Sequence, residues 1–210
     1  MIDKKVLTIQ EQISSGISVL KQGGLVAFPT DTVYGLGASC AIPRAIERIY
    51  GVKERSENLA LPLLLAEPSR INEVASYVSP LAWLLVRKFL PGALTLVLPV
   101  SKSVSRVITG GGKTVAVRIP AHPLVIALIQ GVGSPIIGTS ANLSDQPSAL
   151  TADEVYSQLG DKIDLVIDGG RCPGRESTII DVTGEVPRVL REGAISREEL
   201  KRCVELFDEE

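Results

Sequence analysis

Apolar side chains recur with a helical spacing in several parts of the chain. The predicted helices are residues 4–21, 42–52, 70–90 and 123–130, followed by two shorter ones that begin after Thr151 and Ser196. The first helix is expected to stop at Gly23-Gly24, because glycine favours a helix end. Thr151 and Ser196 are suitable caps, and a glutamate three residues after Thr151 completes a capping-box pattern.

Short runs of apolar and β-branched residues are interspersed among these helices. The predicted strands are residues 25–28, 61–65, 94–100, 114–119, 136–138, 165–167, 177–182 and 188–190. The close spacing within 100–119 and 178–190 indicates antiparallel pairing, and no regular βαβ repeat is present. No linker, low-complexity tail or internal repeat divides the chain. We therefore expect an α/β fold, a single domain over residues 1–210 with its core at about 10–200, built on a twisted mixed sheet with flanking helices.

The composition argues against several classes of protein. A net charge of −2 lacks the basic excess typical of nucleic-acid-binding proteins, although a local basic patch stays an alternative. No run of 18 uncharged apolar residues and no signal-peptide pattern is found, so we expect a cytoplasmic protein without a membrane contact. Three cysteines without paired spacing argue against a disulfide framework or a zinc site. The single histidine, His122, is expected at a turn or helix start, which disfavours histidine-based triads.

Polar residues interrupt apolar surroundings in two short stretches that lie far apart in the sequence. Lys53-x-Arg55 supplies fixed positive charge and fork-shaped donors, whereas Ser140-x-Asn142 supplies short neutral donors and acceptors. Together these stretches are typical of the two halves of an anion site. Residues 30–37 add hydroxyls, a carboxylate and two glycines, which we interpret as a loop beside a strand end.

The remaining chemistry favours binding and alignment over proton transfer. Gly110-Gly111-Gly112 before Lys113-Thr114 lacks the first glycine of a P-loop and leads into a strand, so a hairpin turn is favoured, with phosphate binding by its amides as the alternative. No cysteine–histidine cluster or nucleophile elbow is present, which argues against covalent catalysis. Hydroxyls, amides and guanidinium groups suit phosphoryl or nucleotidyl transfer, with Mg²⁺ carried in on the nucleotide.

Six motifs occur in one order along the chain. They are Pro-Thr-Asp-Thr-Val-Tyr-Gly-Leu-Gly at 29–37, Lys-x-Arg at 53–55, Val-Arg-Ile-Pro at 117–120, Ser-Ala-Asn-Leu-Ser at 140–144, Glu-Ser-Thr-Ile-Ile-Asp at 176–181 and Val-Leu-Arg-Glu-Gly-Ala-Ile at 189–195. In this order they resemble the threonylcarbamoyl-adenylate synthase (YrdC-like) family. The resemblance implies synthesis of threonylcarbamoyl-AMP from L-threonine, bicarbonate and ATP, with release of pyrophosphate. The product would serve a threonylcarbamoyl transferase complex that modifies adenosine 37 of tRNA.

The same resemblance implies which residues form the site. Those expected around threonine are Thr32, Arg118, Ser140 and Ser177, with Arg118 paired to the carboxylate. Those expected around the nucleotide are Lys53, Arg55, Asn58, Thr114, Asn142 and Arg191. No residue is expected to act as a catalytic nucleophile or a metal ligand.

Two positions depart from the family pattern. Residues 56–61 stand where the family has a polar, proline-rich stretch that ends in a lysine or asparagine. Either Asn58 makes the nearby nucleotide contact from one position earlier, or this contact is absent. This segment is also a candidate for a loop that closes over substrates. An apolar residue, taken as Leu64, stands where some relatives have a histidine. After Arg191 the chain is expected to lack the additional C-terminal domain of longer relatives.

Two other functions fit parts of the sequence. An RNA-binding module that recognises tRNA or the ribosome through a basic concavity would bind RNA in a salt-dependent way without nucleotide turnover. A carbamoyl-adenylate domain detached from a hydrogenase-maturation protein would use carbamoyl phosphate. The chain shows no acylphosphatase-like or zinc-finger segment, which disfavours the second.

Overall fold

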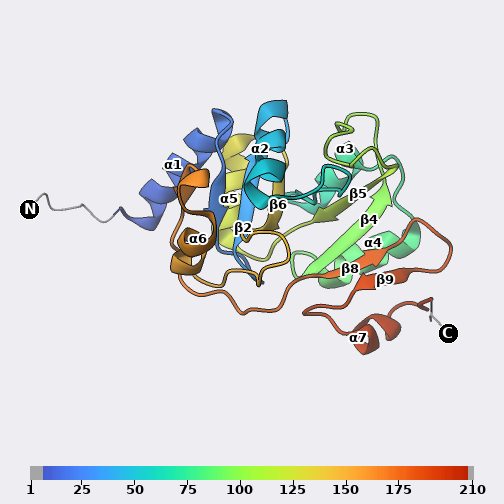
Figure 1. Ribbon diagram of the computed structural model, residues 1–210. Helices are drawn as coiled ribbons and strands as arrows, with labels where there is room; N and C mark the ends of the chain where they lie inside the picture. Colours follow the sequence, from blue (N-terminus) through green and yellow to red (C-terminus); the bar gives the residue numbers. More distant parts are fainter. Residues whose placement is uncertain (1–6, 208–210) are drawn as a thin grey trace, which may run out of the picture.

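The computed structural model describes residues 7–207. Through this part of the chain runs one nine-stranded sheet in the order β7-β1-β2-β6-β3-β5-β4-β8-β9 (Figure 1). The strands are β1 (Val26–Phe28), β2 (Gly35–Ser39), β3 (Leu63–Leu64), β4 (Leu94–Pro99), β5 (Thr114–Arg118), β6 (Ile136–Ser140), β7 (Leu165–Val166), β8 (Thr178–Asp181) and β9 (Arg188–Arg191). Three neighbouring pairs are parallel and the others are antiparallel, which confirms the predicted mixed sheet.

The helices begin and end where the local chemistry favours it. They are α1 (Ile9–Lys21), α2 (Pro43–Lys53), α3 (Ile71–Val74), α4 (Pro80–Phe89), α5 (Pro123–Val132), α6 (Ala152–Leu159) and α7 (Arg197–Lys201), with 3₁₀ turns η1 (Pro68–Arg70) and η2 (Gly160–Lys162). Capping boxes at Thr8 and Ser196 start α1 and α7, since each hydroxyl and its glutamate partner satisfy free amides of the first turn. His122 is the N-cap residue of α5, as expected from the sequence.

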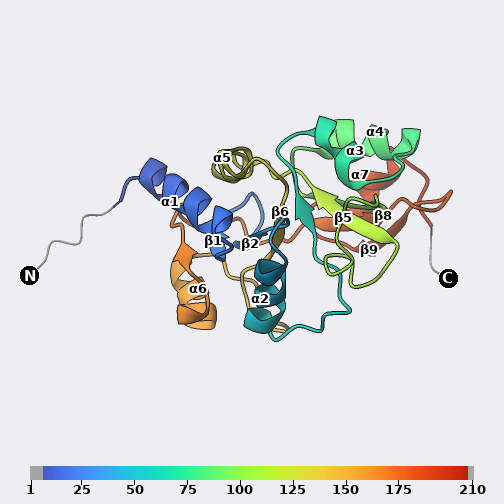
Figure 2. The ribbon, with the colours of Figure 1, turned by 90° about the horizontal axis from the view of Figure 1, so that it is seen from above.

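Helices cover both faces of the sheet. Helices α1 and α5 pack together on one face, where Leu20, Phe28 and Leu128 belong to one buried cluster (Figure 2). Helices α2 and α6 lie on the opposite face, and Ile46 and Val155 belong to a second, larger cluster. Each fully buried aliphatic side chain contributes about 2 kcal/mol, so these two clusters hold the sheet rigid beneath its polar edge.

Three predictions about local structure are wrong in part. The interval 30–37 is not all loop, because β2 starts at Gly35 and pairs with β1 and β6. The helix expected over residues 70–90 is broken by an extended segment before Pro80, since the residue preceding a proline is pushed out of the helical region. At α6 Thr151 caps the helix as expected, but the Glu154 carboxylate bonds the amide of Leu150 and leaves the capping box incomplete.

Both predicted antiparallel pairings are confirmed. Strand β8 pairs with β9, and β4 pairs with β5. A long loop at 100–113 joins β4 to β5, and the three glycines lie at its end. Gly110 has a φ of 58° and lies directly against the carbonyl of Asn58, where a Cβ atom would clash with the backbone. The glycine therefore permits the 100–113 loop to pack against the 54–61 segment beside the sheet.

No helix within residues 7–207 combines the length and the apolar character that a membrane crossing requires.

Candidate substrate-binding site

A cavity of about 300 Å³ opens where loops and strand ends meet over the middle of the sheet. Its lining comes from the loop before β2, the 55–62 segment, strands β3 to β6, and β8 and β9. Six of the ten residues predicted for the site line this cavity: Thr32, Arg55, Arg118, Ser140, Ser177 and Arg191. The sheet therefore brings together side chains that are up to 159 positions apart in the sequence (Arg191 and Thr32, by subtraction of their numbers).

Arg118 lies at the end of β5 with its side chain only 9% exposed. Its Nε donates to the carbonyl of Gly92 at 3.0 Å, its Nη1 to the hydroxyl of Thr32 at 2.9 Å and its Nη2 to the carboxylate of Asp31 at 2.7 Å. Burial lowers the pKa of Arg118, and the Asp31 carboxylate counteracts this effect. Because a guanidinium carries five N–H donors, one N–H remains on each terminal nitrogen for a ligand.

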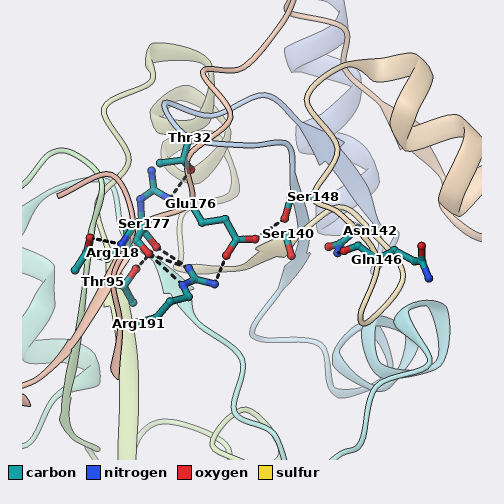
Figure 3. Close-up of polar contacts among 12 residues, drawn as sticks. Thr32, Thr95, Arg118, Ser140, Asn142, Gln146, Ser148, Glu176, Ser177 and Arg191 are labelled. Atoms are coloured by element: carbon teal, nitrogen blue, oxygen red, sulfur yellow. Dashed lines mark hydrogen bonds and ion pairs between the residues drawn. The ribbon is translucent and has the colours of Figure 1, made fainter. Parts of the chain in front are cut away.

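Arg191, Ser177 and Glu176 form a second polar group in the lining of the cavity (Figure 3). Arg191 donates from Nε and Nη2 to the carbonyl of Ser177 at 3.3 and 2.9 Å, and its Nη1 pairs with the Glu176 carboxylate. The hydroxyl of Ser148 also donates to Glu176. Ser177 Oγ and Thr95 Oγ1 are 2.9 Å apart. Arg191 is thus held by one carboxylate that an incoming anion would have to compete with.

Arg55 contributes a third guanidinium to the cavity. Its Nη2 donates to the carbonyl of Ala60 at 3.2 Å, which ties it to the 54–61 segment. Its Nε is buried and has no hydrogen-bond partner among the described residues. A buried donor without a partner is costly, and because this nitrogen is closed off from solvent only a movement of Arg55 would give it a partner.

A family model described as Sua5/YciO/YrdC, telomere recombination, matches residues 18–193. The chain belongs to the Sua5/YciO/YrdC family. Two curated relatives are named threonylcarbamoyl-AMP synthase: one from Pyrococcus abyssi is 40% identical over 95% of this chain and 60% of its own length, and one from Bacillus subtilis is 37% identical over 97% and 59%. A solved structure titled P. abyssi Sua5 complexed with L-threonine has a TM-score of 0.90 at 39% identity, covering 97% of this chain and 61% of that one. The chain thus spans about 60% of the length of these relatives.

Lys53 of this Sua5/YciO/YrdC member does not face the cavity, contrary to the expectation of a phosphate-facing arm. The side chain ends α2 but is 2% exposed. Its Nζ donates to the carbonyls of Ser140 and Asn142 at 2.6 and 2.7 Å and to Asn142 Oδ1 at 3.1 Å. Burial, with a smaller effect from Arg55, lowers the pKa of Lys53 to about 8. All three ammonium donors are used, so Lys53 braces the end of β6.

Three other predicted nucleotide contacts also lie outside the cavity lining. Asn142 is buried, and its amide is engaged by Lys53 and by the carbonyl of Gln146. Asn58 is exposed on the 54–61 segment. Thr114 lies on the same face of β5 as Arg118 but at the opposite end, about 13 Å away at a rise of about 3.3 Å per residue. Their contacts with a nucleotide stay predictions.

Several functional candidates were missed from the sequence. Thr30, Asp31 and Glu176 stand inside motifs that already marked the site, so the short polar spacing around Thr32 and Ser177 could have indicated them. Thr95 carries no such signal, because only the parallel pairing of β4 with β8 places it beside Ser177. Leu64 lines the cavity as an apolar residue, so the wall at this position offers no histidine.

Proposed function

We propose that the protein is a nucleotidyltransferase that forms threonylcarbamoyl-AMP and pyrophosphate from L-threonine, bicarbonate and ATP. The observation that carries this proposal is the convergence of three guanidinium groups, from Arg55, Arg118 and Arg191, on one hydroxyl-rich cavity. Such donors match carboxylate and phosphate oxygens. The names of the curated relatives, and the threonine in the P. abyssi Sua5 structure, support the identity of the substrates.

Threonine is assigned to the side of the cavity around Arg118. The two N–H groups left on this guanidinium suit the two oxygens of a carboxylate. Thr32 lies 2.9 Å from Arg118 Nη1, within reach of the amino group on the same substrate carbon. Ser140 and Ser177 supply further hydroxyls to the same cavity.

ATP is assigned to the side that carries Arg55 and Arg191, with Mg²⁺ arriving on its phosphate oxygens. The amino group of threonine and bicarbonate give a carbamate and a molecule of water, and a carbamate oxygen then attacks the α-phosphorus while pyrophosphate leaves. Fixed positive charge around the phosphates stabilises the charge that develops during this displacement, and holding both substrates in one cavity supplies the orientation. Lys53 and Asn142 contribute by fixing the end of β6 that carries Ser140.

The product is a reactive mixed anhydride that suits a following transfer step. We assign it to a threonylcarbamoyl transferase complex that modifies tRNA, and we place the reaction in the cytoplasm, where that RNA is available. Direct contact with tRNA is not needed for the first step.

The proposal is tested by incubating the folded protein with ATP, Mg²⁺, bicarbonate and L-threonine and measuring pyrophosphate. We expect pyrophosphate release that depends on threonine and a new adenylate that decays in solution. Serine, which lacks the methyl group of threonine, and valine, which lacks its hydroxyl group, serve as matched substrates. No threonine-dependent pyrophosphate from protein with an intact unfolding transition would contradict the proposal, and salt-dependent RNA binding without turnover would favour the RNA-binding module.

A further inference from the structure

Thr30 uses its only hydroxyl proton on a backbone carbonyl. Its Oγ1 lies 2.7 Å from the carbonyl oxygen of Val33, and a carbonyl can only accept, so Thr30 is the donor. The same oxygen accepts the backbone N–H of Thr32 at 3.0 Å. Thr30 therefore has no proton left for the neighbouring hydroxyl of Thr32, which lies 2.9 Å away.

The direction of the Thr32 hydroxyl follows from this. Thr32 must donate to Thr30 Oγ1, since Thr30 cannot donate in return. Thr32 Oγ1 also accepts from Arg118 Nη1 at 2.9 Å, which occupies one of its two lone pairs. Thr32 is 1% exposed, so water does not reset this arrangement. What Thr32 can still offer a ligand is one acceptor and no donor.

We infer that Thr30 is a positioning residue that turns the hydroxyl of Thr32 into an acceptor for an N–H group of the substrate. Arg118 beside it offers only donors, so the two groups form a donor half and an acceptor half that are 2.9 Å apart. A carboxylate and an amino group on one carbon complement this pair. The inference rests on the proposed function and specifies which end of the amino acid each group recognises.

The same acceptor serves before and after carboxylation of the amine. An ammonium group carries three N–H bonds and a carbamate nitrogen carries one, so Thr32 can hold the nitrogen in both. An analogue with hydrogen in place of the amino group offers nothing to this acceptor and leaves it unpaired. (R)-3-Hydroxybutyrate, which keeps the carboxylate and the side-chain hydroxyl of threonine, is the matched probe.

The test compares Thr30→Val with Thr30→Ser in the full chain, using calorimetric binding of L-threonine and of ATP, competition by (R)-3-hydroxybutyrate and thermal unfolding. Valine keeps the shape but frees the Thr32 proton, whereas serine keeps the hydroxyl. We expect Thr30→Val to weaken threonine binding about 10- to 100-fold, the effect of misdirecting one hydrogen bond to a charged group. Binding of ATP and of (R)-3-hydroxybutyrate should change by less than about 3-fold, and Thr30→Ser should stay within about 3-fold of the original protein.

Three results would overturn the inference. Unchanged threonine affinity in Thr30→Val would show that the direction of the hydroxyl is irrelevant. Equal losses for threonine and ATP, or for Thr30→Ser and Thr30→Val, would show a merely structural role. If the original protein does not bind threonine, Thr32 is not an acceptor for this substrate and the inference is wrong. Because binding is measured without turnover, a protein that binds threonine as expected but forms no adenylate would refute the proposed function and leave the inference standing.

Discussion

The buried ammonium of Lys53 makes a specific prediction about stability. Its pKa falls from 10.5 to about 8 on folding, chiefly because burial disfavours the charged form. The unfolded chain therefore binds more protons than the folded one between these two values. Stability then rises with pH across this window, so the penalty for the buried charge is present in full below pH 8 and is lost by about pH 10.5.

The size of the effect follows from the change in the pKa of Lys53. A difference of 2.5 pH units (10.5 minus 8) corresponds to about 3 kcal/mol at 1.36 kcal/mol per unit. This difference already includes the hydrogen bond that a neutral amine gives up, since it has two N–H donors for the three oxygens that the ammonium now contacts. We therefore expect a gain of about 3 kcal/mol.

Urea unfolding of the original protein and of Lys53→Met at pH 7.5, 8.5, 9.5 and 10.5 isolates this gain, because other titrating groups are common to both. The difference in unfolding free energy should shift by about 3 kcal/mol in favour of the original protein as the pH rises. Lys102→Met, which removes an exposed lysine, is the control and should give a flat difference. A flat difference for Lys53→Met, or a shift in the other direction, would refute the reasoning.

Three further predictions concern the cavity. Arg118→Ala should weaken threonine binding about 100-fold and ATP binding less than about 3-fold in calorimetry, and the reverse order would contradict the division of the cavity. Glu176→Gln removes the carboxylate that pairs with Arg191, so ATP should bind about 3- to 10-fold more tightly; weaker binding would show that the carboxylate assists the nucleotide. Gly138→Ala places a methyl group against Leu64 and should lower the unfolding free energy by about 1–3 kcal/mol, measured by urea titration.

Much of the fold was predictable because its signals are local. The hydroxyl of Ser196 and its glutamate partner specify the start of α7, and the close spacing of β8 and β9 specifies their antiparallel pairing. The break in the 70–90 helix also has a local signal, because Ser79 caps α4 and Pro80 lies in its first turn. At this position the proline outweighs the apolar periodicity, which alone predicts one continuous helix.

The differences between the expected and the observed placement of site residues arise from contacts between distant parts of the chain. Lys53 ends a helix, where lysine commonly reaches solvent, and the oxygens that draw it inward belong to residues 87 and 89 positions later. Thr95 becomes part of the site only through the register of β4 against β8. In contrast, Arg118 was identified from its motif, and the structure places it in the cavity. The local sequence thus indicates which charged side chains are present. It does not indicate which of them, such as Arg118, face the cavity and which, such as Lys53, are engaged by backbone oxygens.

The hydrogen bonds between Lys53 and Asn142 couple the Lys53-x-Arg55 motif to the Ser140-x-Asn142 motif. The amide of the buried Asn142 accepts from Lys53 through Oδ1 and donates one of its two Nδ2 hydrogens to the carbonyl of Gln146. A nucleotide contact that turned the side chain of Asn142 away from Lys53 would withdraw one of three oxygens from a buried ammonium. That loss costs about 1–3 kcal/mol unless a phosphate oxygen replaces it.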